Sequence, residues 1–322
     1  MGGNAKGAVI GLIAFAIFAS HDAIVKTMGG IYAPMQLIFF SVTLSFPLAM
    51  LMIIQDPQPG TLRPRHPGWV AVRTGSAVLT GLFGFYAFSV LPLAQVYALV
   101  FATPLIITVL SIPILGETVR LRRWLAVIAG LIGVIVVLRP GSTPFTLGHL
   151  AAVGAAVTGS FTAIVIRKIG AEERPVVLLL YPMIGNFVLM ACFLPFVYKP
   201  MPVEHLGIFA AMSVLGWIGG RLIVAAYSVG EAVIVAPMQY SQIIWATLFG
   251  ALFFGEYPDW GTAIGTLIII ASGLYIVLRE SGSDASAHKP VLNTKLLRPN
   301  IGTGPRPSTI ARLMPRRRDG RA

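Results

Sequence analysis

The sequence predicts an all-α polytopic membrane protein whose ten transmembrane helices form two inverted five-helix repeats. Three observations lead to this fold class: the composition, the number of long apolar segments and an internal duplication. Of the 322 residues, 56% are hydrophobic and only 11% are charged, whereas a soluble domain carries about 25% charged residues. The mean hydropathy of +0.81 agrees. Lipid is therefore the expected solvent for most of the chain.

Ten apolar segments have the length, roughly 17–25 residues, that crosses the hydrocarbon core of a bilayer as a helix. Short connections, several of them rich in proline and glycine, separate the segments. The first segment shows no small-residue cleavage site of a secretory leader, so we expect it to remain as a membrane helix. The approximate limits of the ten segments are 7–27, 34–54, 69–90, 93–115, 122–138, 147–167, 176–197, 206–228, 232–254 and 260–278.

A duplication divides the chain into two halves. The triplet Leu115-Gly116-Glu117 follows the fourth segment, and Phe254-Gly255-Glu256 follows the ninth, 139 residues later. Arg139 and Arg279 close the two copies at an offset of 140. Each copy holds five segments, and because five is odd the second copy enters the membrane from the opposite side. Inverted repeats of this kind are typical of secondary transporters.

The duplication divides the chain into four parts, and a connection that contains proline and glycine joins the fifth apolar segment to the sixth. We expect a cytoplasmic N-terminus at 1–6, a first repeat at 7–139, a second repeat at 140–279 and a basic, disordered cytoplasmic tail at 280–322. The tail has nine Lys or Arg residues against three acidic ones and no apolar period. Its cluster Arg316-Arg317-Arg318 could contact anionic lipid headgroups, although a simply solvated tail fits equally well.

The positive charge predicts the orientation. With the N-terminus inside, 20 of the 24 Lys and Arg residues fall in cytoplasmic segments and 3 in external ones. The bias remains 10 against 3 without the tail. Both termini are therefore expected in the cytoplasm. The net charge of +12 is explained by this distribution, and we expect no nucleic-acid partner.

These features resemble the drug/metabolite transporter superfamily and, more narrowly, its bacterial members with two EamA repeats. The resemblance covers about residues 7–279 and depends most on Leu115-Gly116-Glu117 followed by Gly130 and Gly133. The second copy departs in its shorter turn between Glu256 and Trp260. The resemblance implies a multi-pass transporter of the bacterial inner membrane. The substrates of the family include amino acids, riboflavin, S-adenosylmethionine, purines and drugs, so it implies a class of function and no particular ligand.

The predicted function is secondary transport of a small polar metabolite by alternating access. An amino acid, a vitamin, a nucleoside-like compound or a drug would each fit, and proton coupling, exchange and facilitated passage all remain open. No GxxxxGK[ST] motif indicates ATP drive. No catalytic constellation, cofactor motif or Cys/His metal cluster is recognisable in the sequence. The alternatives are a membrane-embedded enzyme and a non-transporting scaffold or sensor.

Ionisable side chains inside apolar segments are the first candidates for function, since each costs at least about 2.5 kcal/mol to place there. In the first segment His21, Asp22 and Lys26 lie toward the external end. Asp22 and Lys26 are four residues apart and share a helix face. One hypothesis is a proton site or outer gate in which Asp22 changes charge and His21 tunes it. The other is a local Asp22–Lys26 pair that satisfies a snorkelling lysine.

Arg221 lies about two thirds of the way through the eighth segment, too deep to snorkel easily. It follows Trp217 and the small residues Gly219 and Gly220, which allow close helix approach. We expect Arg221 to line a central cavity and attract an anionic or carboxylate-bearing substrate. The alternative is a structural anchor, for example a pair with Glu231.

The ninth segment places amide and aromatic side chains near mid-membrane, just after Pro237. Gln239 and Gln242 share a face, with Trp245 further along it. Recognition of a neutral part of the substrate and polar contacts between helices are both compatible with this pattern. Pro104 and Pro237 are expected to distort their helices. Further candidates for substrate contact are Tyr240, Tyr86 and Tyr97.

The glutamates of the repeated triplet invite a catalytic interpretation. Glu117 and Glu256 are predicted on opposite faces of the membrane, so they cannot act as a carboxylate pair. We expect each to play a structural role in its turn.

Overall fold

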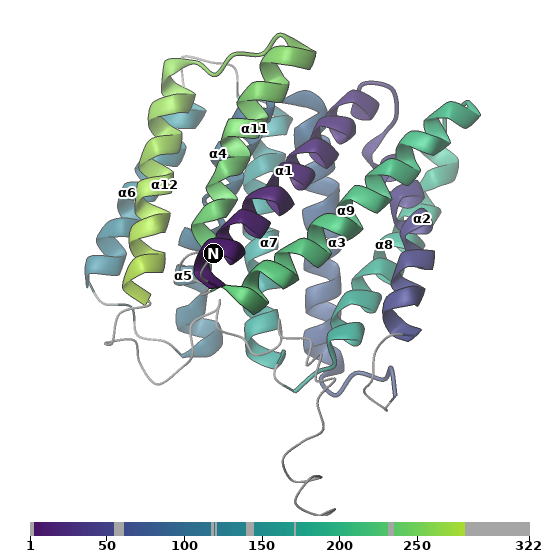
Figure 1. The fold of residues 1–322 in the computed structure, drawn as a ribbon, viewed down its shortest axis with the longest axis horizontal. Coiled ribbons are helices and arrows are strands. Elements are labelled where there is room, and N and C mark those ends of the chain that lie inside the picture. Colours follow the sequence, from purple (N-terminus) through teal and green to yellow (C-terminus); the bar gives the residue numbers. More distant parts are fainter. Residues whose placement is uncertain are drawn as a thin grey trace, which may run out of the picture.

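The computed structural model describes residues 3–54, 61–116, 119, 121–139, 145–170, 172–230 and 235–280, and these residues form helices joined by short connections (Figure 1). The basic tail, Glu117 and Glu231 lie outside the described residues. The helices, in chain order, are α1 (Gly3–Gly29), α2 (Pro34–Ile54), α3 (Pro67–Val90), α4 (Leu93–Val100), α5 (Thr103–Leu115), α6 (Leu121–Leu138), α7 (Leu147–Ile169), α8 (Pro175–Val197), α9 (Val203–Val229), η1 (Ala236–Ser241), α11 (Gln242–Phe249), η2 (Gly250–Phe254) and α12 (Trp260–Glu280).

The described residues include seven spans that are long and apolar enough to cross a membrane, counting α4 and α5 as one. Two shorter apolar helices cover Trp124–Leu138 and Trp260–Ile276. The remaining predicted segment, 232–254, contains η1, α11 and η2 in succession. The predicted all-α polytopic membrane architecture is therefore confirmed, with the ninth segment built from three short helices.

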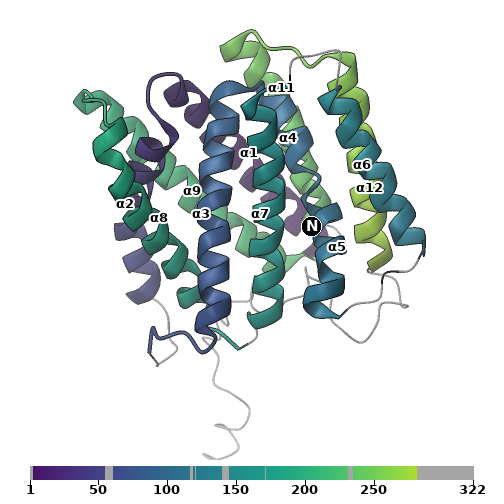
Figure 2. The ribbon, with the colours of Figure 1, turned by 180° about the vertical axis from the view of Figure 1, so that it is seen from behind.

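The helices pair in a regular way. The helix α1 packs against α9, and α3 packs against α7. The first pair lies in front of the second in Figure 1 and behind it in Figure 2. At one end of the molecule α6 packs against α12, and at the other α2 packs against α8. Each of these four pairs joins a helix of the first half of the chain to one of the second half, so the halves share one body.

The fourth predicted segment is interrupted, as Pro104 suggested. The helix α4 ends at Val100, and α5 begins at Thr103 after a two-residue turn. Proline has no N–H, so Pro104 cannot bond the carbonyl of Val100 four residues earlier. The Thr103 hydroxyl donates to that carbonyl instead, at 2.7 Å. In the ninth segment Pro237 stands in the first turn of η1, a 3₁₀ helix, so both expected distortions are present.

A third proline is compensated from a neighbouring helix. Pro182 lies inside α8 and leaves the carbonyl of Leu178 without its helical donor. The guanidinium of Arg73 in α3 donates to this oxygen. A partly buried arginine thus satisfies a backbone carbonyl that the neighbouring helix leaves without its donor.

The glycines of the repeated triplet end their helices in the same way. Gly116 caps α5 with φ 71°, and Gly255 follows η2 with φ 64°. A side chain at positive φ would be strained, which is why glycine occupies this C-terminal position. The triplet therefore marks two equivalent helix ends.

Glycine also allows α6 and α12 to approach closely. A Cβ added at Gly265 would lie 2.6 Å from the carbonyl oxygen of Gly133 and 2.6 Å from Cγ2 of Val137. Since backbone cannot move aside as a flexible side chain can, the two helices would have to separate. By contrast, a Cβ at Gly216 in α9 would meet no described heavy atom within 4 Å.

We predict that Gly265→Ala lowers the stability of the purified protein by about 1–3 kcal/mol, the usual cost of overpacking. Gly216→Ala is the matched control and should be neutral or slightly stabilising, by up to about 1 kcal/mol, because alanine restricts the unfolded chain. Thermal unfolding in detergent measures both. Equal melting temperatures for the two variants would contradict the close α6–α12 contact.

Candidate functional site

The Asp22 carboxylate is the centre of a polar cluster between α1 and α4. Its Oδ1 lies 2.8 Å from Nδ1 of His21, and its Oδ2 accepts a hydrogen bond of 2.5 Å from the Tyr97 hydroxyl. The side chains of His21 and Asp22 are 16% and 17% exposed. Two predicted site residues on α1 thus meet a third, Tyr97, from a distant part of the chain.

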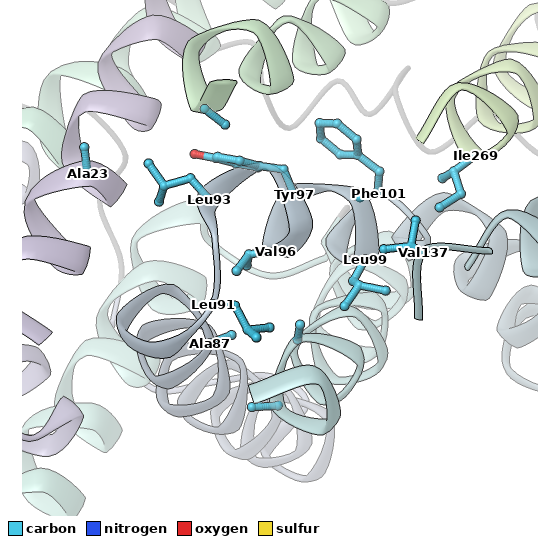
Figure 3. Packing of buried hydrophobic residues seen from close by; sticks show 14 residues of the cluster. Ala23, Ala87, Leu91, Leu93, Val96, Tyr97, Leu99, Phe101, Val137 and Ile269 are labelled. Carbon is cyan, nitrogen blue, oxygen red and sulfur yellow. The ribbon is translucent and has the colours of Figure 1, made fainter. Parts of the chain in front are cut away.

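Tyr97 is held in place by its packing. Six of the eight residues of α4 are buried, Tyr97 among them. Its ring lies between those of Phe88 and Phe101, with centroids 5.3 and 6.0 Å away. Figure 3 shows the Tyr97 hydroxyl directed out of this apolar cluster toward α1, on the side of Ala23. The apolar packing therefore aims one polar atom at Asp22.

Gln242 reaches the same hydroxyl from the second half of the chain. It is the first residue of α11 and is buried. Its Nε2 lies 3.5 Å from the Tyr97 oxygen, at the limit of a hydrogen bond. Tyr240, in the preceding η1, packs edge-on against Phe101 at 5.1 Å between centroids. The cluster thus combines side chains of α1, α4 and the interrupted ninth segment.

Lys26 contacts Glu256, and the alternative Asp22–Lys26 pair is not formed. Lys26 Nζ lies 2.7 Å from Oε1 of Glu256 and donates to the carbonyl of Leu91 at 2.6 Å. The other Glu256 oxygen, Oε2, accepts from the Leu93 backbone N–H at 3.2 Å. Lys26 and Glu256 together join α1, the α3–α4 connection and the turn before α12.

Glu256 is the functional candidate that sequence reasoning missed. Its place in a Gly-Glu turn suggested only a structural role. A usable signal was present, because the predicted orientation puts Glu256 and Lys26 at the same external end of the bundle. What the sequence does not contain is the folding of the ninth segment back against α1, which brings the two charges together.

Further contacts join the two halves at the same end of the bundle. The Gln36 side chain exchanges two hydrogen bonds with the backbone of Lys199, at 2.8 and 2.9 Å. The Tyr32 hydroxyl lies 2.6 Å from Nδ1 of His205. In addition, Gly29 of α1 approaches Ser89 of α3 so closely that a Cβ would overlap it. This end of the bundle is closed by specific polar contacts.

The Arg221 side chain is not part of the Asp22 cluster. Its side chain is exposed on α9, and its guanidinium carbon lies 5.3 Å from the centroid of the Trp217 ring. Arg221 makes no described contact with Asp22 or Gln242. The alternative pair with Glu231 falls outside the described residues. Cavity lining by Arg221 therefore stays a prediction.

The other predicted residues, Tyr86, Trp245 and Gln239, are half-buried and have no described polar contact to Asp22. Tyr86 packs on the same apolar cluster as Tyr97. Trp245 packs against Phe249 in a tilted arrangement with centroids 6.0 Å apart, and Gln239 lies within η1. No group of three or more His, Cys, Asp or Glu side chains in the described ranges is placed to hold a metal ion.

Comparison with known proteins agrees with this architecture. The model of the EamA-like transporter family matches the chain twice, at residues 5–139 and 146–278. A protein of solved crystal structure superposes with a TM-score of 0.56, covering 87% of this chain and 100% of its own, at 20% identity. That likeness concerns the fold.

Several relatives are named for the molecules that they transport. The chain is 25% identical to an S-adenosylmethionine uptake transporter of Rickettsia prowazekii over 86% of this chain and 94% of the relative. It is 28% identical to a riboflavin transporter of Vibrio cholerae, covering 69% and 75%. It is 23% identical to the pseudopaline exporter CntI of Pseudomonas aeruginosa, covering 86% and 98%. With the apolar helices, these relatives make the chain a multi-pass membrane transporter of a small metabolite, as predicted, and it belongs to the EamA-like transporter family.

Proposed function

We propose that the chain moves a small polar metabolite across the bacterial inner membrane by alternating access, with the Asp22–Tyr97–Gln242 cluster at the transport site. The observation that carries this proposal is the meeting of an ionisable side chain of α1 with polar side chains of α4 and α11 inside the bundle. Ionisable groups at such depth are rare and usually belong to substrate or proton pathways.

Two inverted repeats, 7–139 and 140–279, form the framework of the proposal. The helix after the interruption begins at Thr103 in one half and at Gln242 in the other, 139 residues apart. Gly116 and Gly255 have the same offset and nearly the same φ. Equivalent breaks in equivalent spans support a site between the halves, where transporters built from inverted repeats bind their substrates.

The packing at the two ends of the bundle supports alternating access. At the end occupied by Lys26 and Glu256, α1 packs against α3. The equivalent partners in the second half are α7 and α9, and in the described part of the chain they make no comparable contact. The α1–α3 contact therefore has no equivalent of similar extent in the second half, and this difference between the repeats supports a carrier whose halves pack differently at the two ends.

We assign the closed end to the external face and both termini to the cytoplasm, following the distribution of Lys and Arg. Under this orientation the contact of Lys26 with Glu256 lies at the external face. A reporter enzyme that is active only in the cytoplasm, fused after Ala322, tests the assignment: activity is expected, and its absence would reverse the orientation.

We predict that purified protein in proteoliposomes moves at least one small metabolite, with S-adenosylmethionine and riboflavin as the first two probes because relatives are named for them. Uptake and efflux are measured separately, each with and without an imposed pH gradient. Absence of flux across a broad metabolite screen would instead favour the membrane-embedded enzyme or the non-transporting scaffold or sensor.

We predict that Asp22→Asn abolishes any stimulation of flux by a pH gradient, because the amide keeps the shape of the carboxyl group but cannot exchange a proton. Asp259→Asn is the matched control: this aspartate pairs with Arg139 at 2.9 Å outside the cluster. It should leave the pH response unchanged. Full pH stimulation in Asp22→Asn would remove the proton-site role.

We predict that Arg221→Gln weakens binding of a carboxylate-bearing substrate by about tenfold or more, since a charge-assisted hydrogen bond contributes about 1.5–3 kcal/mol. Arg221→Lys, which keeps the charge, should recover part of the affinity. Isothermal titration with the substrate identified in the screen measures both. Unchanged affinity together with lower expression would assign Arg221 to a structural anchor.

A further inference from the structure

Lys26 stands one helical turn after Asp22, yet the two side chains do not pair. On a helix, side chains four residues apart lie on one face with their Cβ atoms about 5–6 Å apart. Long side chains also lean toward the N-terminus of their helix, which would carry the Lys26 ammonium toward Asp22. Helix geometry alone therefore favours an Asp22–Lys26 ion pair.

The structure directs Lys26 elsewhere. Its ammonium contacts Glu256 at 2.7 Å and the Leu91 carbonyl at 2.6 Å, and it lies 5.2 Å from the centre of the Phe254 ring. The lysine side chain is 10% exposed, so these contacts replace most of its hydration. The carboxylate, the carbonyl and the aromatic face together stabilise the ammonium group in this position.

Glu256 is itself fixed in position. Its second carboxylate oxygen accepts from the Leu93 N–H, and its own N–H donates to the carbonyl of Gly250 at 2.9 Å. Glu256 is thereby anchored by its carboxylate to the start of α4 and by its backbone N–H to η2. It can hold Lys26 in a defined place rather than follow the lysine's motion.

The consequence concerns the charge of Asp22. Lys26 is neutralised by Glu256, while the described contacts of Asp22 are those with the Tyr97 hydroxyl and His21. Tyr97 donates a hydrogen bond but brings no positive charge. The Asp22 carboxyl is therefore left without a permanent cationic partner, as a group that takes up and releases protons requires.

We infer that Glu256 is a positioning residue for transport: it holds Lys26 away from Asp22 and so keeps the Asp22 carboxyl free to exchange a proton. The inference depends on the proposed proton role of Asp22. In Glu256→Gln the lysine loses its carboxylate and turns back along α1 to pair with Asp22. Removal of the lysine as well then frees Asp22 again.

Suppression by the second substitution separates this role from a structural one. If the Lys26–Glu256 contact only stabilised the turn, Lys26→Gln could not repair Glu256→Gln, because it would delete a further contact to Leu91. If Glu256 holds the lysine away from Asp22, the Asp22 carboxyl in the double variant Lys26→Gln/Glu256→Gln should be protonated to the same extent as in the wild type.

The probe is a hydrophobic carbodiimide, which reacts with protonated carboxyl groups in apolar surroundings. Full-length protein in proteoliposomes is labelled at one fixed pH, and mass spectrometry of the peptide containing Asp22 quantifies the adduct. Asp22→Asn verifies the assignment of the label. Melting temperatures of every variant verify that the fold is retained.

We expect labelling at Asp22 in the wild type, a fall of about tenfold in Glu256→Gln because an adjacent cation favours the ionised carboxylate, and recovery in Lys26→Gln/Glu256→Gln. Asp259→Asn breaks the ion pair between Arg139 and Asp259, which lies at the same external face as Lys26 and Glu256 in the proposed orientation. In this variant Asp22 should be labelled to the same extent as in the wild type.

Two results would overturn the inference: wild-type labelling in Glu256→Gln, or labelling in the double variant that stays as low as in Glu256→Gln. Failure of the wild type to label at Asp22, at the chosen pH and in a repeat at lower pH, would instead remove the proposed proton site, and the inference with it. The two failures are thus distinguishable.

Discussion

Every backbone N–H and C=O of a membrane-embedded segment must find a partner within the protein, and this constraint governs the whole structure. In hydrocarbon no water replaces a missing hydrogen bond, so the apolar segments are helical almost throughout. The informative places are those where proline or a turn interrupts the helical bonding. There the chain uses polar side chains that could otherwise have been interpreted as functional.

Arg73 and Thr103 illustrate structural use of this kind. The Arg73 guanidinium donates to the Leu178 carbonyl that Pro182 leaves open, and the Thr103 hydroxyl donates to the Val100 carbonyl that Pro104 leaves open. Both polar groups lie within apolar helices. Depth in the membrane therefore does not by itself distinguish a transport residue from one that completes the backbone.

The same constraint places structural polar groups beside the candidate site residues. In the α3–α4 connection, the carbonyl of Leu91 accepts a hydrogen bond from Lys26. The N–H of Leu93, the first residue of α4, donates to Glu256. One ion pair thus satisfies backbone, neutralises two charges and joins the halves of the chain. Asp22, one turn away on α1, is left to Tyr97 and His21. The structural ion pair and the proposed transport residue are thus separated by a single helical turn.

A carrier that alternates between two states needs contacts that form at one end and are absent at the other. Polar contacts between the halves occur at both ends: those of Lys26, Gln36 and Tyr32 lie at one end, and those of His66 with Glu172 and Glu173 lie at the other. In the described residues the difference between the ends is the contact of α1 with α3, which has no comparable equivalent between α7 and α9. The α6–α12 pair, built on close glycine contact at Gly133 and Gly265, has no such asymmetry. We regard it as a fixed end against which the remaining helices can move.

The sequence by itself determined the fold class, the approximate helices and the family, because hydrophobic length and the repeated Gly-Glu turns are local properties of the chain. It also identified Asp22, Tyr97 and Gln242 as separate candidates. Only the tertiary structure decided which of them meet, since Tyr97 and Gln242 are 145 residues apart. It also decided the partner of Lys26, which local helix geometry assigned to Asp22 and the packing of the ninth segment gave to Glu256. Ion pairing between distant helices depends on how those helices pack, and periodicity along one helix does not contain that information.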